Sequence, residues 1–158
     1  MAENYTRLAD TISSHEGKAY ITINGQNREL FEVSALSAQI DLIVQERRML
    51  GHRMTQHKVV GATGTGSLTM YFMNSDALNQ AIQYLRTGQY RGLKLQVKNE
   101  DPQSTVGKQE VVLLNVILAS VPAAILDDSS DDPITFDTDF TFDDIENLES
   151  FRLPENYR

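Results

Sequence analysis

The stretch ITFDTDFTF, residues 134–142, alternates apolar and polar side chains over its whole length. Successive residues of a β-strand point to opposite faces of the sheet, so this alternation predicts a strand with one face in the core and the other in water. The core face carries Ile134, Phe136, Thr138, Phe140 and Phe142. The wet face carries Thr135, Asp137, Asp139 and Thr141.

Other segments before this stretch also have strand patterns. The segment Lys18 to Ile23 runs into Asn24-Gly25, a pair that favours a type I′ hairpin turn because both central positions need positive φ. Residues 30–44 are rich in Val, Ile and Leu, and their spacing of two predicts a long half-buried strand. The apolar positions at that spacing are Ala38, Ile40, Leu42 and Val44. Further strands are expected at 93–97 and 110–120.

A glycine-rich segment, GATGTG at residues 61–66, lies between two β-like runs. Gly61, Gly64 and Gly66 predict a bent or bulged backbone, either with positive φ or with a second backbone close by. This structural role is favoured strongly over a phosphate-binding loop, because Ser67 stands where that motif needs lysine.

Helix signals are clear in one segment, residues 75–88. Ser75-Asp76 offers an N-cap and a first-turn acid, and Gly88 a terminator. The apolar residues of one helix face are Leu78, Ala81, Ile82 and Leu85. One helix among several long strands predicts a mainly β fold of the α+β type.

The length of 158 residues fits a single domain, with an N-terminal arm at about 1–17 and an acidic C-terminal extension at about 143–158 that orders only against something else. Zero cysteines exclude disulfides and thiolate metal sites. The first residues lack a secretory signal pattern, so synthesis in the cytoplasm is expected. The apolar stretch 111–126 is interrupted and too short to span a membrane, so we expect a core strand there and no membrane anchor.

The net charge of −8 is unevenly distributed. Residues from Asp127 onward carry 11 acids and two arginines, whereas the preceding part has a net charge of +1. A chain this acidic is a poor candidate for tight binding to phosphate backbones. The opposite bias occurs at residues 46–58, whose bases are Arg47, Arg48, Arg53 and Lys58, accompanied by His52 and His57.

This basic segment is either an ordinary solvated loop or a docking element. The second interpretation is favoured because arginine and methionine are enriched at protein interfaces. The apolar members of the segment are Met49, Leu50 and Met54. Acidic C-terminal residues of another copy are candidate partners for it.

No motif for catalysis, cofactor binding or metal binding is visible. His52 and His57 are five residues apart, which places them on no common helix or strand face. The acidic run 127–132 lacks the glycine and final glutamate of a calcium loop. A Gly-x-Ser-x-Gly elbow is also missing. We therefore expect a protein that is not an enzyme and has no cofactor, although a hydrolase with a dispersed site would escape such motifs.

The block LGHRMTQHKVVGATGTGSLTMYF, residues 50–72, resembles the tail-tube proteins of contractile phages and of defective, PBSX-type prophages of Gram-positive bacteria. The resemblance rests on Gly51, Arg53-Met54-Thr55, His57-Lys58, Gly61 and Gly64-Thr65-Gly66. The later segments Pro133 to Phe136 and Leu153 to Glu155 resemble the same family.

The resemblance implies a small β-barrel or sandwich with one flanking helix, similar to other tail tubes and to the tube of type VI secretion. It also implies a structural subunit that forms homohexameric rings, which stack into a hollow tube inside a contractile sheath. The implied partners are further copies, the sheath, baseplate and tail terminator proteins, and DNA that passes through the lumen without tight binding. The implied location is the tail of a virion or phage-like particle.

Within this interpretation the basic segment is assigned to contacts between subunits or rings. The wet face of 134–142 is the candidate lumen surface, since an acidic wall repels DNA. The alternative from another class is a monomeric β-rich binding module with an acidic partner surface.

Overall fold

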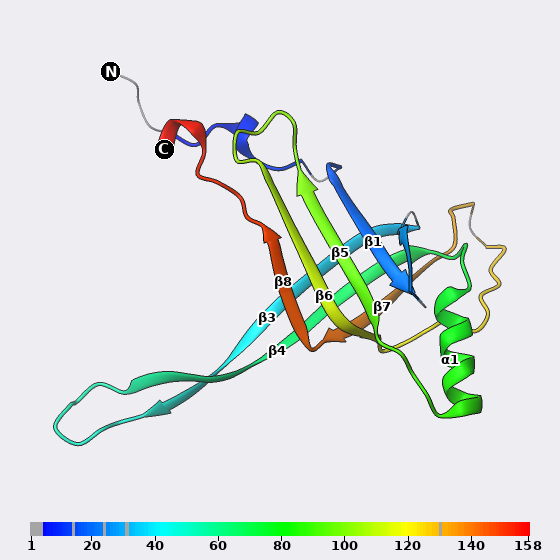
Figure 1. Cartoon of the computed structure of the whole chain (residues 1–158), viewed down its shortest axis with the longest axis horizontal. Helices are drawn as coiled ribbons and strands as arrows, with labels where there is room; N and C mark the ends of the chain where they lie inside the picture. The colour runs from blue at the N-terminus through cyan, green and yellow to red at the C-terminus, as the bar shows by residue number, and fades with distance from the viewer. Residues whose placement is uncertain (1–4, 14, 24, 31, 130) are drawn as a thin grey trace.

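The computed structural model describes residues 5–13, 15–23, 25–30, 32–129 and 131–158 and consists mainly of antiparallel strands (Figure 1). The strands are β1 (Gly17–Ile23), β2 (Gln26–Glu29), β3 (Val33–Arg47), β4 (Gln56–Tyr71), β5 (Leu93–Glu100), β6 (Lys108–Leu118), β7 (Thr135–Phe142) and β8 (Asp144–Glu149). The helices are α1 (Asp76–Thr87) and two 3-10 turns, η1 (Leu8–Asp10) and η2 (Glu155–Tyr157). This confirms the mainly β fold with a single α-helix in the described part of the chain.

The strands follow the order β2-β1-β5-β6-β7-β4-β3, and β8 pairs separately with β6. All pairings are antiparallel. Strand β6 connects two layers, because its residues 110–114 pair with β8 while Ile117 and Leu118 pair with β7. The sheet therefore bends at β6, so that β7, β4 and β3 lie across β1, β5 and β6 (Figure 1).

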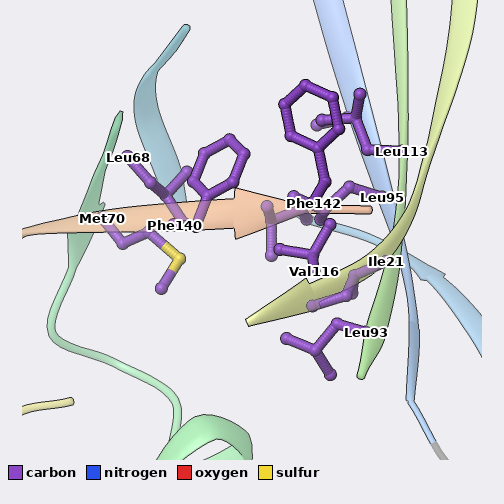
Figure 2. Packing of buried hydrophobic residues seen from close by; sticks show 11 residues of the cluster. Ile21, Leu68, Met70, Leu93, Leu95, Leu113, Val116, Phe140 and Phe142 are labelled. Carbon is purple, nitrogen blue, oxygen red and sulfur yellow. The ribbon is translucent and has the colours of Figure 1, made fainter. Parts of the chain in front are cut away.

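The hydrophobic core fills the angle between these two layers (Figure 2). Phe142 of β7 lies beside Leu113 of β6, and Phe140 lies beside Leu68 and Met70 of β4. The most deeply buried residues are Leu93, Leu95, Leu113, Val116 and Phe140. The alternation predicted for 134–142 is confirmed, because Phe136, Thr138, Phe140 and Phe142 are wholly or partly buried and the intervening residues are exposed.

The first hairpin also agrees with its sequence signal. β1 and β2 pair from Tyr20–Glu29 to Ile23–Gln26 around a turn in which Gly25 has φ +80°. Asn24, the other turn residue of the prediction, lies outside the described residues. β1 then pairs along its other edge with β5, which joins the hairpin to the main sheet.

Strand β4 is one continuous strand, where the sequence predicted two β-like runs joined by a bend. Its register against β3 shifts at two places, between Val33 and Ala35 and between the pairs Ile43–Gly61 and Val44–Val59, and at the second Val60 is the extra residue of a bulge. The bulge is thus confirmed beside Gly61, while Gly64 and Gly66 lie in the regular part of the ladder. Gly61, Gly64 and Gly66 are not among the residues with positive φ.

Gly64 and Gly66 are needed because the aromatic rings of the opposite strand lie over them. β7 pairs Phe142 with Gly64 and Phe140 with Gly66. A Cβ atom at Gly64 would stand 2.6 Å from Cδ2 of Phe142, and one at Gly66 would stand 2.5 Å from the backbone oxygen of Ser37 and closer still to the Phe140 ring. The predicted close approach therefore occurs at these two glycines.

Helix α1 has the predicted bounds, and Gly88 ends it in the left-handed conformation with φ +74°. Its N-terminus differs from the prediction, because Asn74 Oδ1, rather than the Ser75 side chain, accepts the hydrogen bond from Asp76 N at 2.7 Å. The predicted apolar face is only partly covered, since Leu85 is 79% exposed and the buried helix residue is Gln80.

The two ends of the chain meet at loop 101–107. Asp10 of η1 accepts hydrogen bonds from Thr105 N at 3.0 Å and from Thr105 Oγ1 at 2.6 Å, and these bonds lower the pKa of its carboxyl group. On the other side, Glu155 N donates to Thr105 Oγ1 at 3.0 Å. Asn156 Nδ2 also donates to the backbone oxygen of Tyr5 at 2.7 Å.

The first part of the acidic extension, expected at about 143–158 and to order only against something else, forms β8 against the body of the same chain. This strand pairs with β6 from Leu114–Asp144 to Glu110–Glu149. One edge of β8 is thus hydrogen-bonded within the same chain, although its six residues all remain exposed. Within the described residues, no helix is long and apolar enough to cross a membrane.

Candidate assembly surfaces

The β3–β4 hairpin extends far beyond the rest of the molecule (Figure 1). β7 pairs with β4 only from Gly64 to Tyr71. Beyond that point β3 and β4 have only each other among the described strands. We call residues 41–63 the free arm; it comprises the distal halves of both strands and the connecting tip, residues 48–55.

The free arm exposes apolar side chains. Leu42 is 60% exposed, and four further residues of the arm are similarly open to solvent: Ile43, Val44, Val59 and Val60. The sequence predicted that Ala38, Ile40, Leu42 and Val44 lie on a half-buried strand, and this is wrong for the single chain, in which all four are exposed. Their spacing does place them on one face, which continues the core face of β4.

The tip carries most of the candidate contact residues. Arg47 ends β3, His57 and Lys58 begin β4, and the others lie in the turn, namely Arg48, Met49, Leu50, His52, Arg53 and Met54. Gly51 has φ +83°, and His52 Nδ1 lies 3.0 Å from the backbone oxygen of Met54. His57 Nε2 is 3.5 Å from Glu46 Oε1. All nine candidate residues are exposed, so the hairpin displays them together.

A second surface is polar and spans three strands. Thr135, Asp137, Asp139 and Thr141 of β7 pair with Tyr71, Thr69, Ser67 and Thr65 of β4, and β4 pairs in turn with β3. We call this the polar face; its members are Thr135, Asp137, Asp139, Thr141, Thr63, Thr65, Ser67, Thr69, Ser37, Gln39 and Asp41. It contains three aspartates and no base.

Hydrogen bonds hold the side chains of the polar face in place. Thr69 Oγ1 donates to Asp137 Oδ1 at 2.6 Å, and the hydroxyl oxygens of Ser37 and Ser67 are 3.0 Å apart. Gln39 Nε2 donates to Asp41 Oδ2 at 3.2 Å. The sequence analysis found only the β7 members. The period of two in 37–41 and 63–69 was the available signal for the others, but assigning them to one surface required the strand register.

A partly buried ion-pair cluster lies beside the start of α1. Arg28 Nη2 is 2.9 Å from Glu32 Oε1 and 3.0 Å from Asp76 Oδ2. These carboxylates, Glu32 first, raise the pKa of the Arg28 guanidinium. The cluster borders a cavity of about 50 Å³ between the core and the start of α1. It ties β2 to the helix.

Metal binding has no geometric support in the part of the chain that the structure describes, where no three His, Asp or Glu side chains lie close enough to share an ion. His52 and His57 are held by their own local partners on the free arm. Two surfaces therefore stand out in the described chain, one apolar and basic, the other polar and acidic.

Comparison with protein families gives a match between residues 4–149 and the family described as phage tail tube protein. The chain is also similar to the phage-like element PBSX protein XkdM of Bacillus subtilis (strain 168). The two are 30% identical over 140 residues, which cover 89% of this chain and 92% of that protein.

Solved structures with this fold come from contractile injection systems. A chain of the extended PVC sheath/tube terminator matches with a TM-score of 0.69 and 12% identity, covering 94% of this chain and all of that one. A chain of the extended PVC sheath-tube complex matches with a TM-score of 0.64 and 10% identity, covering 90% and 94%. At these identities the likeness shows the fold alone.

Proposed function

Because the chain belongs to the phage tail tube protein family and is a structural subunit of a tail tube, we propose that its copies form homohexameric rings that stack into a hollow tube. The tube either conducts DNA or pierces the target envelope. The observation that carries this proposal is the free arm, whose apolar side chains have no cover in the single chain.

Burial on a neighbouring copy is the simplest way to stabilise this arm. An isolated two-stranded hairpin is marginally stable in water at best, and contiguous exposed apolar surface marks interaction sites. An arm on one copy that fits a different surface on the next makes a heterologous contact. Such contacts close into rings or propagate as filaments, and a stacked tube requires both.

We propose the partners from the assemblies in which structurally similar chains occur. The PVC chains named above come from a sheath-tube complex and a sheath/tube terminator. Another similar chain belongs to the anti-feeding prophage baseplate. We assign this subunit the same kinds of neighbours, namely a sheath around the tube and baseplate and terminator proteins at its ends, in a particle assembled in the host cytoplasm.

The polar face is our candidate for the lumen wall. Six copies at −8 each give a ring a charge of about −48. Duplex DNA carries one negative charge per roughly 1.7 Å of its axis, so an acidic wall repels it and keeps it mobile, whereas a basic wall would hold it by counterion release. Asp41, Asp137 and Asp139 supply that charge without a neighbouring base on the face.

The tip is assigned to contacts between stacked rings. It lies at the far end of the hairpin (Figure 1), and Arg48 and Arg53 are exposed there beside Met49 and Met54, next to Arg47 at the end of β3. Arginine and methionine are enriched in interfaces, and a base-rich tip complements the acidic surface that the rest of the chain provides.

Negative-stain electron microscopy of the purified chain tests the proposal. Concentrated protein should form hollow tubes, or rings of six subunits in averaged end views. A chain that remains monomeric at every concentration, by light scattering and by microscopy, would favour a β-rich binding module and contradict the proposal. Rings with another number of subunits would correct the hexamer alone.

A further inference from the structure

We infer that strand β8 of one copy is the docking site for the free arm of the next copy, an inference that rests on the proposed function. The occupant of the exposed arm is thus a second copy of this chain, and the contact lies within a ring rather than at the tip. Two observations point to this contact: β7 leaves part of the β4 edge unpaired, and β8 has an unpaired edge of its own.

The first observation is where β7 leaves β4. Their last pair is Phe142–Gly64, after which Asp143 redirects the chain so that β8 pairs with β6. The edge of β4 from Gln56 to Thr63 is therefore left without a strand partner in the described chain. Unpaired strand edges are ready templates for pairing with another chain.

The second observation is that β8 is itself incomplete. Strand β6 covers one of its edges, and its other edge has no partner among the described strands. Leu148 is 56% exposed, and Ile145 and Phe151 also reach solvent. Each of the two elements therefore combines a free edge with uncovered apolar side chains.

Their lengths match. Residues 56–63, the free edge of β4, span roughly 26 Å at about 3.3 Å per residue, and the six residues of β8 span roughly 20 Å. One β8 strand can therefore cover the apolar part of the arm and leave the tip beyond it. The tip remains available for the contact between rings.

Their charges are opposite. Residues 56–63, the free edge of β4, contain one base, Lys58, and no acid, a net charge of +1. Residues 143–149 contain four acids and no base, a net charge of −4. Of these acids, Glu149 lies 3.2 Å from Lys108 Nζ, and Asp143 accepts a hydrogen bond from the Asn115 side chain. Charge complementarity sets the register of such a contact and rejects wrong partners.

The chain has no cysteine, which makes cross-linking a clean test. Leu42→Cys and Leu148→Cys proteins are prepared separately, mixed, allowed to assemble and treated with a short bis-maleimide linker. We expect a covalent dimer in the mixture and much less in either protein alone. The double variant should give a ladder of covalent oligomers that ends at the number of subunits in the ring.

A matched control uses Leu85→Cys on α1, which is more exposed than either test site. Mixed with Leu42→Cys, it should give no dimer above background. The pair Val44→Cys and Ile145→Cys serves as the second test if the first pair impairs assembly.

Microscopy of the same samples distinguishes failure of this inference from failure of the proposed function. Tubes without a cross-link between the arm and β8 above the Leu85→Cys control, for both pairs, would overturn this inference and leave the proposed function intact. If neither the variants nor the wild-type protein forms tubes, both the proposed function and this inference are contradicted.

Discussion

The two halves of the β3–β4 hairpin use the same alternation of side chains and differ in what covers them. In the proximal half, residues 33–40 and 64–71, Leu68 is 4% exposed because β7 and the core lie over it. In the free arm, Leu42 on the same face is 60% exposed. A pattern of period two thus identifies a strand face that is suited to burial. It does not say whether that face is covered by the same chain or by a neighbouring copy.

The largest effect is expected at the tip. The triple variant Arg47→Glu, Arg48→Glu and Arg53→Glu should abolish tube formation, because it removes the basic surface of the arm and places like charges against an acidic neighbour. Its far-UV circular dichroism should be unchanged, since all three side chains are exposed. Negative-stain microscopy measures the loss.

A control with the same change of charge tests whether the position matters. Lys18→Glu, Arg91→Glu and Lys94→Glu alter three exposed bases on the body of the molecule. These substitutions should leave tubes in place. Normal tubes from the tip variant would show that the arm is not used in assembly.

The next largest effect is a difference in stability between valine substitutions in the proximal half of the hairpin and in the free arm. Gly66→Val should destabilise the unassembled chain by about 3 kcal/mol or more, because the new side chain meets the Phe140 ring and the backbone oxygen of Ser37, which cannot move aside. Gly61→Val in the arm should be mild, since its Cβ would meet only Ile43 Cδ1 at 3.5 Å. Urea unfolding followed by circular dichroism compares them, and equal midpoints would contradict the close approach.

A smaller effect concerns the polar face. The double variant Asp137→Lys and Asp139→Lys should still assemble, and its tubes should retain added duplex DNA that wild-type tubes release. Co-sedimentation of tubes and DNA at low salt measures the retained fraction. In a cryo-EM map of the wild-type tube, both aspartates should face the channel; if they face outward, β7 is removed from the lumen wall.

The smallest effect is on the stability of the single chain. Leu42→Ala should change the free energy of unfolding of unassembled protein by about 0.5 kcal/mol or less, because the side chain is exposed there. Leu68→Ala on the same face should cost about 2–5 kcal/mol. A large loss from Leu42→Ala would mean that the arm is buried within its own subunit.

Sequence alone predicted the parts whose cause is local. The hairpin at Gly25, the end of α1 at Gly88 and the two faces of 134–142 depend on neighbouring residues and on backbone preferences. The basic segment 46–58 had a solvated loop as one interpretation, yet its residues 46–47 and 56–58 belong to β3 and β4, because ladder bonds hold polar strands as well as apolar ones.

The remaining features depend on distant residues. Strand β8 has only two apolar side chains, and its partner β6 lies more than 25 residues earlier in the chain. The positions of Gly64 and Gly66 under Phe142 and Phe140 likewise follow from the β4–β7 register. The sequence alone indicates that these glycines lie in or near a strand. Without the strand register, it does not indicate that the Phe140 and Phe142 rings lie over them.

The meeting of both chain ends at Thr105 constrains the order in which the protein can mature. Thr105 bonds to Asp10, 95 residues earlier, and to Glu155, 50 residues later. Contacts between such distant residues carry a large loop-closure cost and form late in folding. The closed loop therefore has to wait until residues 155–158 have been synthesised, so the two ends of the chain are joined through Thr105 only after the C-terminal segment exists.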